Sequence, residues 1–274
     1  MNKKVDSIKT VVMAVGLLAS VAQAGVPLNG LQGSGGFVFN PLAYTVGSEA
    51  NTDSIVGKPQ VAAWFANFGD SSINWYAASA AISVAKVAEF SYGYGLIDME
   101  PDPANTHNLG AKLCLIEENL DGTPWVPALA VGGVFMMTDA DTDYDDSGVN
   151  AYVVATKTIK QTPVPFLVSA GLLYSDEIAY GIMGHNEADS VFFGNIAVMP
   201  VENITVGVEY KQGVDAGDDT AQVTDSDCIG GQVAWTYDAN WTFVGAYADT
   251  GSTKKGATDF GFGDSLMVSA QYTF

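Results

Sequence analysis

Charged side chains are rare inside the apolar segments of this chain, and the few that occur alternate with apolar residues. If those segments are membrane strands, a charge on the lipid face near the midplane costs about 2–4 kcal/mol. We therefore expect five polar side chains to face a lumen: Glu89, Lys112, Lys157, Glu209 and Lys211. Side chains in such positions influence which ions and solutes enter a pore.

A second group of candidate residues is acidic and lies between the apolar segments. In the stretch 139–148, Asp143, Asp145 and Ser147 precede a glycine and match the first half of a calcium-binding loop. Val154 occupies the twelfth position, where a bidentate Glu would close such a site. We expect no cofactor, and at most weakly bound Ca²⁺ in the outer loops. The alternative is that acidic loops only keep an exposed rim soluble.

Residues that could support catalysis are few. The histidines are His107 and His185, and His185 lies near two carboxylates, which is half of an acid–base pair. The sequence indicates no serine partner and contains no G-x-S-x-G motif. Cys114 and Cys228 match no zinc spacing, and we expect both to be unpaired. The sequence thus predicts that the protein is not an enzyme.

The elements that would position these side chains are clearest at the carboxy terminus. In 264–274, every second residue is apolar or aromatic: Leu266, Val268, Ala270, Tyr272 and Phe274. A strand with one apolar face and terminal aromatic residues is typical of transmembrane β-barrels. This ending resembles the signature that the assembly machinery of outer-membrane barrels recognises, so Tyr272 and Phe274 are candidate assembly-signal residues. The alternative is the last strand of a soluble sandwich.

The amino terminus indicates export. Three lysines precede an apolar run at 11–21, and Ala22-Gln23-Ala24 fits a cleavage site, so residues 1–24 are predicted to be a cleaved signal peptide. That run is too short to span a bilayer, and no later segment has about 20 unbroken apolar residues. An exported chain with lipid-type strands and no helical anchor is expected in the bacterial outer membrane.

From residue 59 onward, apolar-rich segments of roughly ten residues recur, which predicts an all-β fold. We expect residues 59–274 to form a closed antiparallel transmembrane β-barrel of about 12 strands, with ten or fourteen as the alternatives. The predicted strands are 59–68, 73–83, 87–97, 108–118, 125–137, 149–159, 165–175, 190–199, 204–212, 228–237, 240–249 and 264–274. Long acidic connectors alternate with short ones, as expected for outer loops and periplasmic turns.

The charge of the chain limits its partners. The formal net charge is −20, and all 11 basic residues counted as Lys or Arg are lysines. This argues against nucleic-acid binding, which needs a basic surface, and against an anion-selective pore. The expected partners are outer-membrane lipid, lipopolysaccharide through bridging divalent ions, and the barrel-assembly machinery; the oligomeric state is left open.

Several phrases resemble known families. GSGGFVFNPLAYTVG (33–47) is similar to the opening of exopolysaccharide-associated outer-membrane barrels. HNLGAKLCLIEEN (107–119) and GNIAVMPVENITVGVEYKQG (194–213) resemble a family of single-domain bacterial outer-membrane barrels without an established activity. The resemblance implies the fold and the location, and it implies no catalytic residues.

Residues 25–58 are glycine-rich and show no sustained period. They are expected to lie in the periplasm as a tail or a strand pair, or to plug the lumen, with Phe37, Phe39 and Tyr44 packing against small inward residues. The sequence favours a passive channel or transporter for small neutral or cationic solutes. The alternative is a non-conducting structural or surface-interaction barrel, with a link to exopolysaccharide or envelope organisation.

Overall fold

The computed structural model describes eleven stretches of the chain: 27–47, 54–69, 73–98, 103–140, 146–175, 189–213, 223–225, 227–251, 253–255, 258–259 and 263–274. The predicted signal peptide lies outside these residues. No helix among the described stretches is long and apolar enough to cross a membrane.

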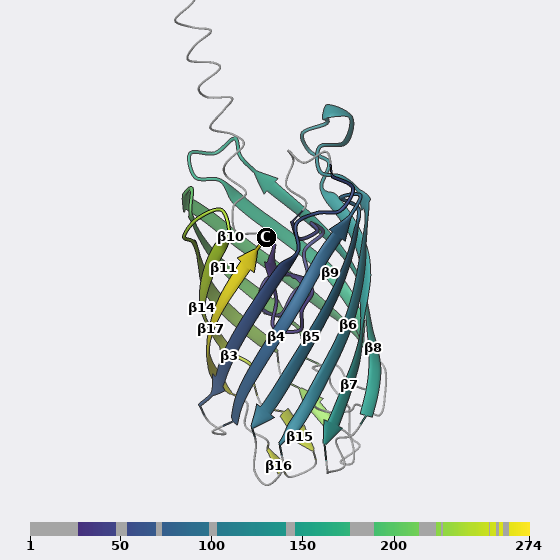
Figure 1. The fold of residues 1–274 in the computed structure, drawn as a ribbon, viewed down its shortest axis with the longest axis vertical. Helices are drawn as coiled ribbons and strands as arrows, with labels where there is room; N and C mark the ends of the chain where they lie inside the picture. The colour runs from purple at the N-terminus through teal and green to yellow at the C-terminus, as the bar shows by residue number, and fades with distance from the viewer. Residues whose placement is uncertain are drawn as a thin grey trace, which may run out of the picture.

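Twelve antiparallel strands close into a barrel (Figure 1), as the alternation predicted. They are β3 (Gln60–Phe68), β4 (Ile73–Val84), β5 (Ala88–Asp98), β6 (Ala104–Ile116), β7 (Ala128–Ala140), β8 (Asp146–Ile159), β9 (Phe166–Ser175), β10 (Asp189–Val201), β11 (Ile204–Lys211), β13 (Cys228–Thr236), β14 (Trp241–Asp249) and β17 (Asp264–Thr273). Each strand pairs with its neighbours along the chain, and β17 pairs with β3 to close the ring.

The two ends of the barrel differ in their connections. Gln60, at the start of β3, pairs with Thr273, at the end of β17, so the barrel begins and finishes at the same end. The turns 85–87, 160–165, 202–203 and 237–240 are short and lie at that end, the upper one in Figure 1. Outer-membrane barrels place short turns in the periplasm and long loops outside. At the outer end, β12 (Val223–Asp225), β15 (Thr253–Lys255) and β16 (Thr258–Asp259) form a small sheet.

The strands have one lipid face and one lumen face. Burial alternates residue by residue, as in β14, where Thr242, Val244, Ala246 and Ala248 are buried between exposed neighbours. The outward side chains form an apolar belt that includes Tyr76, Phe90, Leu109, Phe135, Leu172, Ile196, Val208, Val233 and Leu266. At its periplasmic edge, Tyr272 contacts the rings of Trp241 and Phe274 edge-on, both at 5.0 Å. This aromatic cluster fits the interfacial girdle of a membrane barrel.

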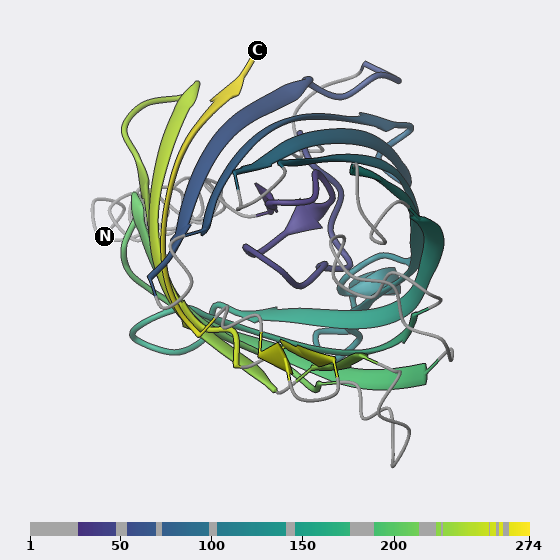
Figure 2. The same cartoon turned by 90° about the horizontal axis from the view of Figure 1, so that it is seen from below.

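Residues 27–47 lie inside the barrel, and we call them the plug (Figure 2). The plug contains β1 (Leu28–Asn29) and β2 (Gly35–Gly36), which pair with each other. Most of its residues are buried, including Phe37, Leu42 and Val46. The lumen is therefore occupied along the height that the plug spans.

The periplasmic turn between β6 and β7 is longer than the sequence suggested. It runs over 117–127, contains a 3₁₀ turn η1 (Leu120–Gly122), and holds Asn119 and Asp121 at φ 59° and 54°. The register of β6 against β7 shifts between Cys114 and Ile116, and β6 ends at Ile116. Asparagine and aspartate tolerate this left-handed conformation because their short polar side chains bond locally.

Candidate functional site: the occupied lumen

Two polar sites on opposite walls of the barrel hold the plug by its backbone. The first lies on β5 and β6 and consists of Glu89 and Lys112, which we call the β5–β6 site. The second lies on β11 and consists of Glu209 and Lys211, which we call the β11 site. In the order of strands around the barrel, half of the ring separates them.

At the β5–β6 site, a buried ion pair grips two points of the plug. Lys112 Nζ lies 3.1 Å from Glu89 Oε2 and donates to the Gly35 carbonyl oxygen at 2.8 Å. The Glu89 carboxylate accepts the amide hydrogens of Gly35 and Val46, both at 2.8 Å. Opposite charge and hydrogen bonds thus compensate both buried groups, which is the condition under which a buried pair is tolerated. A Cβ on Gly35 would lie 2.6 Å from that carboxylate, so only glycine fits there.

At the β11 site, one carboxylate oxygen holds the bend of the plug at residues 37–41, which we call the tip. Glu209 Oε2 accepts the amide hydrogens of Phe39 and Asn40, each at 3.0 Å. The Asn40 amide nitrogen donates to Asn195 Oδ1 at 3.0 Å and to the Tyr210 carbonyl oxygen at 2.9 Å. The tip is thereby fixed to β10 and β11 by charge-assisted and neutral hydrogen bonds.

Apolar packing fills the space between the two polar sites. On one side, Leu28, Leu31 and Val38 of the plug join a cluster with Trp64, Phe68, Trp75 and Met267 of the wall. On the other side, Phe37 and Leu42 pack against Leu167 and Ala197, and Ala43 packs beside Tyr152 and Phe193. Gly207 leaves room for the Phe37 ring, because a Cβ there would lie 2.8 Å from it.

Further contacts hold the plug at the periplasmic end. Gln271 of β17 accepts the Asn29 amide hydrogen at 3.0 Å and donates to the Asn29 carbonyl oxygen at 3.2 Å, and Trp64 Nε1 donates to the same oxygen at 2.9 Å. The Tyr44 hydroxyl donates to Glu118 Oε2 at 2.9 Å, which connects the plug to the periplasmic turn. Both ends of the plug therefore lie near the periplasm.

The wall keeps polar atoms that nothing satisfies while the plug is in place. Among the described residues, buried side-chain nitrogen or oxygen atoms without a hydrogen-bond partner occur on Asn29 of the plug and, in the wall, on Gln60, Trp75, Ser79, Ser83, Thr106, Asn108, Asn195 and Gln232. Leaving such a group unsatisfied costs about 1–3 kcal/mol. These atoms have almost no accessible surface, and each would gain a hydrogen bond where water reached it.

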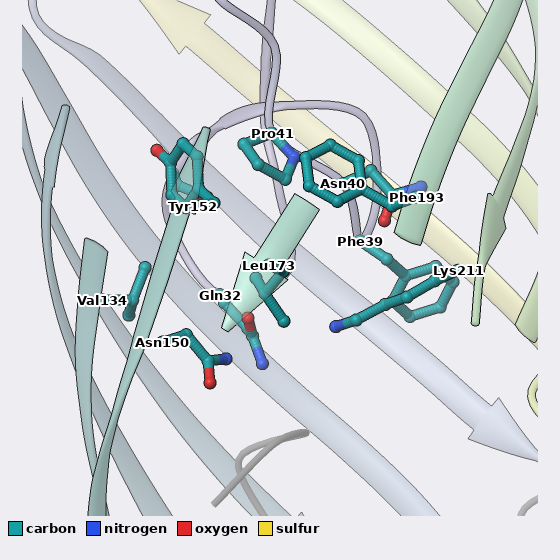
Figure 3. A pocket seen from close by; sticks show the side chains of 11 residues that line it. Gln32, Phe39, Asn40, Pro41, Val134, Asn150, Tyr152, Leu173, Phe193 and Lys211 are labelled. Atoms are coloured by element: carbon teal, nitrogen blue, oxygen red, sulfur yellow. The ribbon is translucent and has the colours of Figure 1, made fainter. Parts of the chain in front are cut away.

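A cavity lies between the tip and the wall (Figure 3). It is a narrow, partly open hollow, and the ≈ 350 Å³ that no atom fills includes open solvent. Plug residues Gln32, Phe39, Asn40 and Pro41 face wall residues that include Asn150, Tyr152, Leu173, Phe193 and Lys211. Because Lys211 is at the outer end of β11, the cavity lies on the side of the plug that faces the long loops.

The profile of the family described as "Protein of unknown function (DUF3034)" matches residues 25–263. The chain belongs to the DUF3034 family. Among curated proteins, none matches this chain.

Solved structures share the barrel at low sequence identity. The KdgM porin is 12% identical, covers 78% of this chain and 99% of its own, and has a TM-score of 0.51. The NanC porin is 10% identical, covers 79% and 98%, and has a TM-score of 0.50. An outer membrane channel from Pseudomonas putida F1 is 9% identical, covers 82% and 100%, and has a TM-score of 0.48. This DUF3034 chain is an outer-membrane β-barrel.

The structure buries four of the five predicted lumen side chains against the plug or its cavity, and it places the fifth differently. On β8 of this DUF3034 protein, Tyr152, Val154 and Thr156 are buried and Val153 is exposed, so Lys157 has the parity of the outward residues. The prediction that Lys157 faces the lumen is therefore wrong. Lys157 lies at the periplasmic end, not the midplane, and its ammonium pairs with Glu118 at 3.1 Å and donates to Asn119 at 2.6 Å.

The remaining predicted residues are placed as follows. Asp143 and Asp145 lie outside the described residues, and Ser147 is exposed on β8. No group of three or more His, Cys, Asp or Glu in the described ranges could hold a metal. Cys114 and Cys228 are free, as expected. Glu118 and Gln271 were not predicted, although Gln271 alternates with the apolar residues of β17 and could have been found by that signal.

Proposed function

We propose that this protein is a gated outer-membrane channel for small neutral or cationic solutes, and that the plug closes it in the conformation described. The observation that carries this proposal is the set of unsatisfied polar atoms on the lumen wall. A wall built only to hold the plug permanently would gain stability by pairing these groups or replacing them with apolar ones. A wall that is hydrated in a second state needs them.

The attachment of the plug supports the same proposal. The wall holds the plug through hydrogen bonds that water can replace, and both plug ends lie near the periplasm. The two structures with the highest TM-scores reported above belong to proteins named as porins. The solute preference rests on charge, because the chain has a net charge of −20 and contains no arginine, which disfavours anions at the rim.

The alternative is a non-conducting barrel with a permanent plug. Its support is the apolar burial of Phe37, Leu28 and Leu42, which exposure to water would oppose. Planar-bilayer recordings distinguish the two functions. We expect rare openings of the full chain with cation preference, and a sustained pore when residues 27–47 are deleted in a variant that keeps heat-modifiable mobility. Equal conductance with and without the segment, or anion preference, would rule the gated channel out.

A further inference from the structure

The plug shows what kind of molecule the lumen wall recognises. Beside the apolar packing and the side-chain bonds of Asn40 and Tyr44, the wall binds the plug backbone at several separate points, through N–H and C=O groups that every peptide carries. We propose that the solutes of this channel are short uncharged or zwitterionic peptides, which bind the lumen wall where the plug binds. This inference rests on the proposed channel function and names its substrate class.

The contacts divide by the group that they recognise. Glu89 and Glu209 accept four plug amide hydrogens between them, and Lys112 donates to a plug carbonyl oxygen. The Gln271 side chain accepts a hydrogen bond from the Asn29 N–H and donates one to the Asn29 C=O, as the backbone of a neighbouring strand would. Thr156 Oγ1 accepts the amide hydrogen of Ala43 at 2.9 Å. These partners recognise N–H and C=O groups that other short peptides also carry, including one bent as residues 37–40 of the plug are.

The shape of the wall also suits a peptide backbone. At Gly93, a Cβ would lie 2.7 Å from the carbonyl oxygen of Gln32, so the plug backbone runs directly against the β5 backbone. At Gly207, the missing side chain leaves space for the Phe37 ring. The wall thus lets a peptide main chain lie directly against it at Gly93, and it leaves an apolar recess for a side chain at Gly207.

The charges of the wall favour a peptide without net charge. Each polar site combines one carboxylate with one lysine, Glu89 with Lys112 and Glu209 with Lys211, so neither site has a net charge. Ion selectivity comes from rings of one sign, and these sites provide none. Paired opposite charges do complement the ammonium and carboxylate ends of a short zwitterion.

Competition with the plug sets the concentration at which such peptides act. A tethered segment has an effective concentration of order mM. Free peptides at tens of millimolar therefore compete with the plug once it leaves the wall, even if each free peptide binds weakly. The peptide takes over the hydrogen bonds of the plug, and the lumen stays open while it passes.

The test uses the full chain in proteoliposomes and two peptides of identical composition. Trialanine and trisarcosine are isomers, but the N-methyl groups of trisarcosine remove its peptide N–H donors. Swelling is measured in iso-osmotic trialanine, trisarcosine and arabinose, and arabinose reports the proposed channel function alone. We expect trialanine to enter at least about threefold faster than trisarcosine, because carboxylates that accept N–H groups make strong hydrogen bonds.

Glu209→Gln should lower the ratio of trialanine to trisarcosine entry toward one, whatever it does to the absolute rates. Glu202→Gln removes the same charge from the exposed turn between β10 and β11 and should keep the ratio. Equal entry of the two isomers, or entry of arabinose without either peptide, overturns the peptide inference and leaves the channel intact. No entry of any solute overturns both. If Glu209→Gln does not assemble, the ratio of trialanine to trisarcosine entry through the unmutated protein still tests the peptide inference.

Discussion

The β5–β6 site and the β11 site both hold the plug with a buried carboxylate, yet they differ in how that carboxylate is compensated. Glu89 has a lysine at 3.1 Å and two amide donors from plug residues that are eleven positions apart. Glu209 uses a single oxygen for two adjacent amides at the tip, beside a cavity that is partly open to solvent. The first site fixes two distant points of the plug, and the second fixes two adjacent residues, Phe39 and Asn40, that line the cavity.

This difference assigns separate roles to the two sites. A buried ion pair that loses one partner leaves a charge that nothing compensates, so the β5–β6 site should govern the stability of the whole barrel. A carboxylate near a cavity can exchange amide donors for water, so the β11 site should govern the opening of the plug. Four substitutions test this division, from the largest effect to the smallest.

The largest effect is expected from Lys112→Met. This change leaves the Glu89 carboxylate buried without its cation, and breaking a buried pair in this way costs about 3–5 kcal/mol. The free energy of unfolding in urea, measured in detergent or lipid, should fall by that amount. The control is the double variant Glu89→Gln with Lys112→Met, which should recover much of the loss. If the double variant loses as much free energy of unfolding as Glu89→Gln and Lys112→Met lose in sum, Glu89 and Lys112 are not coupled.

A smaller effect on stability, and a larger one on gating, is expected from Glu209→Gln. The hydrogen bonds from Phe39 and Asn40 lose their charge assistance, and bonds to charged groups contribute about 1.5–3 kcal/mol. Since 1.4 kcal/mol is tenfold, the open probability in planar bilayers should rise by about tenfold or more. An unchanged open probability would show that the tip is not the point of release.

Gly207→Leu sharpens the comparison by pushing the tip away from β11 without touching a charge. The new side chain would enter the space of the Phe37 ring, and overpacking of this kind costs about 1–3 kcal/mol. Protease added from the periplasmic side should cut the plug faster in this variant. Gly231→Leu is the matched control, because position 231 is on the lipid face of β13, where the nearest atom to a Cβ is 3.8 Å away. Equal cleavage of the two variants would contradict a tight fit at the tip.

The barrel was more predictable from sequence than the lumen, for a physical reason. Alternation is a local property, so β11 and β17 were found within a residue or two of their ends. The extent of β6 was missed because 104–107 is polar on both faces: His107 is outward and bonds Tyr92 at 2.8 Å, which hides the alternation. The parity of β8 was wrong because a lysine was assumed to lie at the midplane, where it is costly, and Lys157 lies at the periplasmic end.

The site itself was predictable only in its parts. Inward carboxylates and lysines follow from the cost of charge in lipid, which is how Glu89, Lys112, Glu209 and Lys211 were selected. Their partners do not follow, because Asn29 and Gln271 are separated by 242 positions and the plug has no periodic pattern. The sequence also gave no means to choose between a periplasmic tail and a lumenal segment for residues 25–58, since glycine-rich stretches without a period suit both.

The smallest effect is expected at Asp227, which fixes the outer end of β11 from outside the lumen. The amide of Gly213 donates to Asp227 Oδ1 at 2.9 Å and the Tyr210 hydroxyl donates to Oδ2 at 2.8 Å, and these two bonds hold the pKa of Asp227 below its usual range. A lowered pKa means that the carboxylate stabilises the folded state above the unfolded pKa of about 3.9. That contribution is lost as the pH falls through the lower folded value.

Asp227→Asn should therefore reduce the unfolding temperature slightly at pH 7 and pH 5, and the difference from the unmutated protein should vanish as the pH falls through the lowered pKa of Asp227. The reduction is small because Asp227 is exposed and solvent screens its interactions. Tyr210→Phe removes one of the two donors and should reproduce part of the pH-dependent difference. Because Asp227 touches neither the plug nor the lumen, the open probability should not change in either variant. If Asp227→Asn opened the channel as Glu209→Gln does, β11 would act as one unit, and the separate role of the lumenal carboxylate would be wrong.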